Sequence, residues 1–188
     1  MKYILALTGY KQCGKDTIAN IIQKKIPEIQ RIAFADTLKK YVSNITGFSL
    51  DEIEKLKLNN NLNFPIGKNV YNMREMLIKF ANELRNLTDD GIWAKLALEN
   101  ANNEKSILIT DLRFLIEEKI LKDFAKKNNY ELIIIKIISN LESCKKNEAE
   151  KEVDLINYNF KIFNEKSNLK KVEKDIDEYL SILKRVNF

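Results

Sequence analysis

The sequence contains no histidine and only two cysteines. Without histidine, the chain has no imidazole general base, no His–Cys nucleophile pair and no histidine-ligated metal. Cys13 and Cys144 lie far apart in the sequence, so they form neither a disulfide framework nor a metal-ligand cluster. Any proton transfer must therefore use carboxylates, lysine or the substrate itself.

Long apolar runs are also absent. No stretch approaches the roughly 20 residues that cross a bilayer. The segment from Met1 to Leu7 is basic and then apolar, but its apolar part is shorter than a signal-peptide core and leads into a glycine motif. We therefore expect no membrane association and a cytoplasmic location, which would be the host cytoplasm for a protein of viral origin.

The charge of the chain points to no particular partner. The 188 residues carry a net charge of +5, and the basic residues are interleaved with acidic ones instead of forming an arm. The apolar share of 45% suits a single domain with its own core. Nucleic-acid binding rests on the charge alone, so we expect no stable nucleic-acid partner.

Strand and helix patterns alternate along the chain. Short apolar runs near residues 5, 108 and 134 indicate strands buried on both faces, as parallel strands are. Five segments have strand patterns: 2–8, 29–34, 106–110, 131–138 and 159–163. The sequence therefore predicts a three-layer α/β fold with a parallel five-stranded sheet.

The region between the second and third strand patterns is expected to be helical. Asp36 is placed to cap one helix, and residues 72–87 have a strong helical period. Residues 57–71 are polar and rich in asparagine, with Pro65 and Gly67, so we expect a long mobile loop there.

A glycine motif lies between the first strand pattern and the first helix pattern. Gly9 and Gly14 flank four residues, and Lys15 follows. This is the P-loop pattern, in which backbone N–H groups, a helix N-terminus and a lysine bind the phosphates of a nucleotide. Asp16 stands where serine or threonine usually ligates Mg²⁺, and Thr17 follows it.

The run from Gly14 to Thr17 resembles the bacteriophage-type deoxynucleoside monophosphate kinases, a P-loop NMP kinase-like family. Metazoan phosphomevalonate kinases share the Gly-Lys-Asp variant. Other blocks resemble the family in the same order along the chain: residues 34–39 (FADTLK), 73–93 (MREML to W), 109–114 (ITDLRF), 147–150 (NEAE) and 160–165 (FKIFNE). The chain departs from the family at Asn147 and Ala149, where histidine and serine usually stand.

The resemblance implies a P-loop NTPase fold that transfers phosphate from ATP, with Mg²⁺, to a deoxynucleoside monophosphate. It implies a single kinase domain whose core is residues 1–35 and 104–188. Residues 36–103 would be a helical acceptor-binding insertion, and residues 139–157 a short lid.

The resemblance also implies roles for individual residues. ATP would be bound by Gly9, Lys11, Cys13, Gly14, Lys15, Asp16, Thr17 and Asn164. The acceptor would be bound by Asp36, Lys39, Arg74, Arg85, Trp93, Arg113 and Glu150. Catalysis would use Lys15, Asp16, Asp111 and Arg113, and the metal would be held by Asp16, Thr17 and Asp111.

Several alternatives stay open at the level of the sequence. Asp111 is also placed to cap a helix, Trp93 to fill a core and Asn164 to form a turn. The acceptor could be another small phosphorylated molecule such as phosphomevalonate. Because residues 139–157 carry lysines and no arginine, a non-catalytic ATP-binding protein is a further alternative. The sequence permits a homodimer without requiring one.

Overall fold

The computed structural model describes residues 2–59, 62–66, 69–140, 148–165 and 168–185. The chain divides into two compact units. Unit 1 comprises Met1–Ala33 and Asn100–Phe188, and unit 2 comprises Phe34–Glu99. Unit 2 is thus an insertion in the sequence of unit 1.

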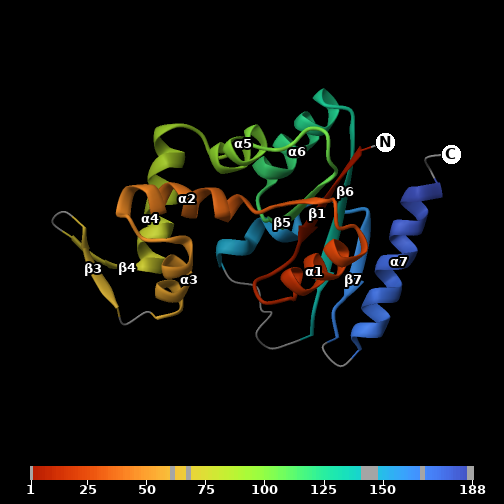
Figure 1. Ribbon diagram of the computed structural model, residues 1–188, viewed down its shortest axis with the longest axis horizontal. Helices are drawn as coiled ribbons and strands as arrows, with labels where there is room; N and C mark the ends of the chain where they lie inside the picture. Colours follow the sequence, from red (N-terminus) through yellow and green to blue (C-terminus); the bar gives the residue numbers. More distant parts are fainter. Residues whose placement is uncertain (1, 60–61, 67–68, 141–147, 166–167, 186–188) are drawn as a thin grey trace. The chain divides into compact units, whose positions relative to one another are not determined.

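Unit 1 is built on a parallel five-stranded sheet (Figure 1). Its strands are β1 (Lys2–Thr8), β2 (Gln30–Ile32), β5 (Ile107–Leu112), β6 (Tyr130–Ile138) and β7 (Phe160–Phe163). They lie in the order β2-β5-β1-β6-β7, and each pair of neighbours is parallel. The predicted α/β fold with a parallel five-stranded sheet is confirmed.

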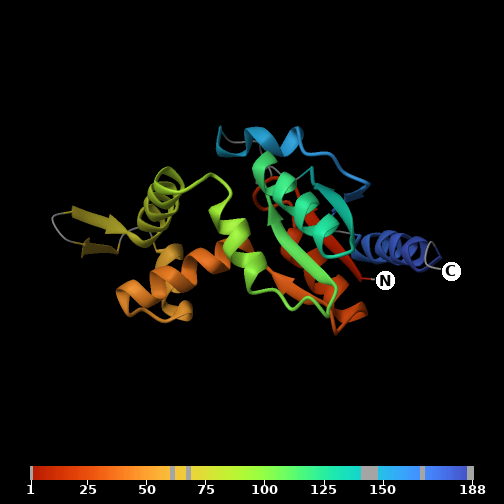
Figure 2. The ribbon, with the colours of Figure 1, turned by 90° about the horizontal axis from the view of Figure 1, so that it is seen from above.

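Helices cover both faces of this sheet (Figures 1 and 2). Leu5 and Leu7 of β1 pack in one core with α1 (Lys15–Lys25) and α7 (Leu169–Arg185). Ile4 and Ala6 point to the opposite face, because side chains alternate along a strand, and are fully buried there. Helix α6 (Leu115–Lys127) packs on β6. Burial on both faces explains why these strands read as continuous apolar runs.

Unit 2 has its own apolar core. It consists of α2 (Phe34–Thr46), α3 (Leu50–Leu58), α4 (Met73–Leu87), α5 (Ile92–Glu99) and the strands β3 (Asn63–Ile66) and β4 (Asn69–Asn72). The buried cluster of this core contains Val42, Ile53, Met73, Met76 and Leu77. The methionines and Leu77 lie on the face of α4 that the helical period predicted.

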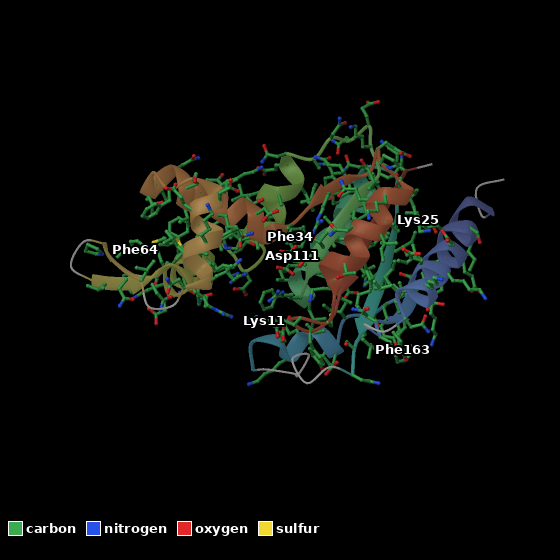
Figure 3. The ribbon with its side chains drawn as sticks, turned by 60° about the horizontal axis from the view of Figure 1, so that its bottom comes forward. Lys11, Lys25, Phe34, Phe64, Asp111 and Phe163 are labelled. Atoms are coloured by element: carbon green, nitrogen blue, oxygen red, sulfur yellow. The ribbon has the colours of Figure 1, made fainter. Side chains whose placement is uncertain are left out.

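The predicted mobile loop over residues 57–71 is wrong for residues 63–66 and 69–71, whereas residues 60–61 and 67–68 lie outside the described part of the chain. Strands β3 and β4 pair antiparallel in this stretch, with Phe64 opposite Tyr71. Phe64 also contacts Phe48 edge to face, with ring centroids 5.3 Å apart, and is labelled in Figure 3. The asparagines suggested a loop, but the aromatic residues between them supply a packed face, and packing decides whether a short strand forms.

Two further expectations shift by a few residues. Helix α2 begins at Phe34, so Asp36 lies in its first turn and does not cap it. A carboxylate in the first turn is still favourable, because the N-terminus of a helix carries partial positive charge. The same helix start shortens the strand expected over residues 29–34 to β2, which ends at Ile32.

No helix in the described part of the chain is both long and apolar enough to cross a membrane.

The two-sided burial of β5 predicts a large effect of truncating one of its side chains. Leu108 is fully buried in the core beneath α1, so Leu108→Ala should lower the free energy of unfolding by about 2–5 kcal/mol. Leu155→Ala is the matched control, because Leu155 is 63% exposed and its truncation should change stability by at most about 0.5 kcal/mol. Urea unfolding followed by circular dichroism measures both; similar effects would contradict this core assignment.

Candidate phosphate-binding site

The loop between β1 and α1 requires its two glycines. Gly9 has φ +146° and Gly14 has φ +95°, in the region that side chains rarely adopt. A Cβ atom on Gly9 would lie 2.5 Å from the carbonyl oxygen of Ile137, and one on Gly14 would lie 1.8 Å from Nδ2 of Asn164. The spacing that predicted a P-loop therefore corresponds to two points of close backbone approach.

Lys15, the first residue of α1, is held within this loop. Its Nζ donates hydrogen bonds of 2.7 Å to the carbonyl oxygens of Gly9 and Tyr10, and the residue is 7% exposed. Burial lowers the pKa of Lys15 below its usual 10.5, although nearby Cys13 and Glu150 oppose this shift. Cys13 is fully buried, with its Sγ 3.8 Å from Nζ of Lys15.

Asn164 anchors the loop to the last strand. It follows β7, its backbone N–H donates to the carbonyl oxygen of Ile138 at 2.7 Å, and its Nδ2 donates to the carbonyl oxygen of Cys13 at 2.9 Å. The residue is 5% exposed. The sequence predicts either ATP binding or a turn for this residue, and its amide contacts the glycine loop at Cys13.

The carboxyl end of β5 carries Asp111 and Arg113. Thr8 at the end of β1 is in register with Leu112, so this end of β5 lies beside the start of the loop. Figure 3 labels Asp111 in β5 and Lys11 in the loop. Helix α6 is preceded by Phe114 as its N-cap residue, so Asp111 does not cap it. Capping of α6 is therefore not the role of Asp111.

The short 3₁₀ segment η1 (Glu148–Asp154) contacts the loop and the sheet through carboxylates. Oε1 of Glu150 accepts the backbone N–H of Lys11 at 2.7 Å, and Oε2 of Glu152 accepts the backbone N–H of Leu115 at 2.7 Å. Asp154 accepts the Tyr10 hydroxyl at 2.5 Å. Of the predicted lid over residues 139–157, residues 141–147 lie outside the described part of the chain, and with them Asn147.

Buried polar atoms without a hydrogen-bond partner gather at this loop. Within the described residues, three side-chain atoms are buried and unpaired: Oγ1 of Thr8, Oε2 of Glu150 and Oδ1 of Asn164. Thr8 directly precedes Gly9, and the other two residues donate to or accept from the loop backbone. Such atoms are costly in a folded protein and mark a place where a ligand or water completes the bonding.

The expected metal residues differ in their surroundings. Asp16 is 85% exposed at its side chain and forms a 2.7 Å ion pair with Arg31. Thr17 is exposed, and Asp111 is half-buried. The described part of the chain contains no group of three His, Cys, Asp or Glu residues that could hold a metal by itself.

The predicted acceptor residues in unit 2 have varied environments. Lys39 forms 2.6 Å ion pairs with Asp36 and Glu54; burial alone would lower the pKa of Lys39, but these two hydrogen bonds raise it. On α4, Arg74 is exposed, and Arg85 donates to Oδ1 of Asn82 at 3.2 Å.

Trp93 lies inside unit 2. It is 3% exposed, and its Nε1 donates to the carbonyl oxygen of Ala81 at 3.2 Å. Its ring also contacts Tyr41 and Phe80. These contacts match the alternative of a core residue, and they leave its ring unexposed for stacking on a base.

Sequence reasoning missed two positioning residues. Glu117 is buried and accepts the backbone N–H groups of Arg113 and Phe114 through Oε2, at 2.9 and 3.1 Å. Glu117 lies three residues after Phe114, the spacing of a capping box, but the sequence signature of that motif needs a residue such as Ser or Thr at the N-cap position, so it gave no signal here. Arg31 binds both Asp16 and Asn20, and no local pattern signals this contact.

Comparisons with known proteins leave the family of this chain open. No protein-family model matches the chain, and no curated protein matches it. Among solved structures, it is similar to the Mycobacterium tuberculosis APS kinase CysC in complex with AMPPNP and APS, at 14% identity over 97% of this chain and 98% of that chain, with a TM-score of 0.43. It is also similar to a sugar kinase from Janibacter sp. HTCC2649, at 13% identity over 98% and 95% of the two chains, with a TM-score of 0.41. Both similarities are too distant to carry function, which is inferred below from the residues themselves.

The geometry of Gly14 predicts a strong effect of adding one carbon atom there. Gly14→Ala should weaken triphosphate binding by about tenfold or more, because the new Cβ meets Asn164 and also strains the backbone. Gly47→Ala is the matched control, since Gly47 has φ +77° but nothing within 4 Å of its added Cβ. Titration with a fluorescent ATP analogue measures both variants, with melting curves as a check on folding. Equal affinities would show that the close approach to Asn164 is unimportant.

The lowered pKa of Lys15 predicts a pH dependence of binding. As pH rises towards 10.5, Lys15 loses its proton earlier than an ordinary lysine, so ATP affinity should start to fall below that pH. In the same window the unfolded chain holds more protons than the folded one, so this lysine's contribution to stability should increase with pH. Calorimetric titration over a pH series tests the affinity. Lys15→Arg keeps its charge throughout, so a parallel decline in that variant would contradict the assignment to Lys15.

Proposed function

We propose that this protein is a P-loop kinase that transfers the γ-phosphate of ATP to a deoxynucleoside monophosphate. The single observation that carries the proposal is the loop itself. Two glycines with positive φ and a buried lysine at the start of α1 meet at one place. A turn of this kind presents backbone N–H groups and an ammonium group, which are the donors that the phosphates of a nucleotide need.

Phosphoryl transfer needs positioned positive charge more than acid–base chemistry. Lys15 would neutralise the β- and γ-phosphates, and Arg113 would bind the transferred phosphoryl group through its planar guanidinium. Glu117 fixes the backbone that carries Arg113. Gly9, Lys11, Cys13 and Gly14 would contribute loop backbone, and Asn164 would hold that loop in shape.

A phosphorylated acceptor asks less of the protein than a hydroxyl acceptor does. A hydroxyl acceptor needs a base to take its proton, a task that an aspartate performs in protein kinases, whereas the phosphate of a monophosphate is already an anion at neutral pH. The chain has no histidine but many carboxylates, so the lack of histidine does not decide between the two acceptors. The same reasoning holds for phosphomevalonate, and the deoxynucleotide is favoured by the sequence blocks that resemble the phage kinases.

The residues present fit a magnesium ion by their donor chemistry. Asp16, Thr17 and Asp111 supply carboxylate and hydroxyl oxygens, the ligands that Mg²⁺ prefers alongside phosphate and water. They would hold the ion, which would supply neutralisation of phosphate charge. For Asp16 this requires release from Arg31, because the two side chains are paired at 2.7 Å.

In unit 1, Arg113 and Glu150 would bind the acceptor, as the resemblance implies. Arg74 and Arg85 would bind its phosphate, and Asp36 and Lys39 would line its site. Trp93 would support this region from the core of unit 2. We further infer a cytoplasmic protein that works on small molecules, with no stable nucleic-acid partner.

One observation favours a second candidate function, a non-catalytic ATP-binding protein. Asp16, which replaces the usual serine or threonine, is engaged by Arg31. A protein that keeps the loop but does not release this carboxylate would bind ATP and turn over nothing.

A coupled ADP-release assay tests the proposal, with ATP and Mg²⁺ against a panel of dNMPs, NMPs and phosphomevalonate. Turnover on one or more dNMPs is expected, and Lys15→Ala should remove it. Arg113→Lys keeps the charge but loses bidentate contact, so kcat should fall by roughly 10–100-fold, in line with the loss of one transition-state contact. Turnover on phosphomevalonate alone would overturn the acceptor assignment. ATP binding without turnover on any acceptor would favour the non-catalytic candidate.

A further inference from the structure

The carboxylate of Glu150 is buried among the positive groups of the phosphate-binding loop. Its Oε1 accepts the backbone N–H of Lys11 at 2.7 Å and lies 3.8 Å from Nη1 of Arg113. Its charge also acts on Lys15, where it opposes the lowering of the lysine pKa by burial. Glu150 itself is 1% exposed. The donors around this carboxylate are those that a phosphoryl group would use.

The bonding of this carboxylate is incomplete. Oε2 of Glu150 is buried and has no hydrogen-bond partner among the described residues. A buried charged oxygen without a partner is costly, and a residue kept only for structure would be expected to satisfy both oxygens. Glu152, two residues along the same segment, is the contrast, because it is only half-buried and accepts the Leu115 N–H.

The segment that carries Glu150 is fastened independently of it. Glu152 accepts from the N-terminus of α6, and Asp154 accepts the Tyr10 hydroxyl and pairs with Lys136 at 3.2 Å. Glu150 is therefore not needed to attach η1 to unit 1. Its burial against the loop calls for another explanation.

We propose that Lys11 N–H and Arg113 form a subsite for a phosphoryl anion, and that the carboxylate of Glu150 occupies this subsite until a phosphorylated ligand displaces it. This rests on the proposed function only in that the loop binds phosphates. A carboxylate and a phosphate carry the same sign of charge, so they compete for the same donors. Glu150 therefore weakens the binding of phosphorylated ligands, and removing its charge should strengthen that binding.

Glu150→Gln tests the subsite directly. Glutamine keeps the size of the side chain and an oxygen that accepts the Lys11 N–H, but it removes the negative charge beside Arg113. The variant should bind inorganic pyrophosphate and ATP about tenfold more tightly or better than the wild type, because a like charge within about 4–6 Å of the anion is gone. Isothermal titration calorimetry of the full-length protein at fixed ionic strength measures both affinities.

Glu152→Gln is the matched control. It removes the same charge from the same segment but from a carboxylate that bonds Leu115 and not the loop. Its affinities should stay within about twofold of the wild type, because this half-buried charge contacts Leu115 and not the loop. Unchanged or weaker binding in Glu150→Gln, or equal tightening in Glu152→Gln, would overturn the proposal. Melting curves establish that each variant is folded.

A second measurement needs no variant. Saturating the wild-type protein with pyrophosphate should increase amide hydrogen exchange around residue 150, because the Glu150 side chain leaves the Lys11 N–H while Glu152 and Asp154 keep the rest of η1 attached. Exchange in the body of α6 should not change. Slower exchange around residue 150 would contradict displacement of Glu150. Both measurements depend on ligand binding and not on turnover. Failure of the kinase assay on every acceptor would therefore refute the proposed function without affecting this test of Glu150.

Discussion

The contact of Asn164 with Gly14 and Cys13 is the constraint on which the glycine loop between β1 and α1 depends. The loop has no regular secondary structure to hold it. The side chain of Asn164, which follows the edge strand β7, fixes its last turn. With Gly14 in place, α1 starts at Lys15 and the ammonium group reaches the carbonyl oxygens of Gly9 and Tyr10. The loop, the lysine and the first helix are therefore one rigid arrangement, supported from β7.

Local periodicity and glycine spacing predict much of this structure. Continuous apolar runs identify β1, β5 and β6, because strands buried on both faces cannot alternate. Positions Gly9, Gly14 and Lys15 identify the loop, because this spacing between a strand and a helix is the P-loop pattern. The apolar runs and the glycine spacing both depend on residues that are close in the sequence. They therefore predict strands and tight turns well, because local geometry decides whether these form.

Contacts between distant parts of the chain could not be predicted in the same way. Asn164 lies 151 positions from Cys13, and Glu150 lies 139 positions from Lys11. Periodicity indicates that a side chain is buried, but not which partner it meets. The loop expected over residues 57–71 shows a different error. Its polar composition suggested a loop, but the packing of Phe64 on Phe48 favours the pairing of β3 with β4. The composition of a segment indicates how soluble it is, whereas the formation of a hairpin depends on side-chain pairs across its two strands.

The insertion of unit 2 between neighbouring strands has a consequence for divergence. Strands β2 and β5 are parallel neighbours in the sheet, and all of unit 2 is part of the connection between them. Such a connection can gain, lose or exchange residues without changing the register of any strand pair in unit 1. The strand pairs of unit 1 therefore place no constraint on the length of unit 2. Insertions and deletions confined to this one continuous stretch of the gene would leave the sheet of unit 1 untouched.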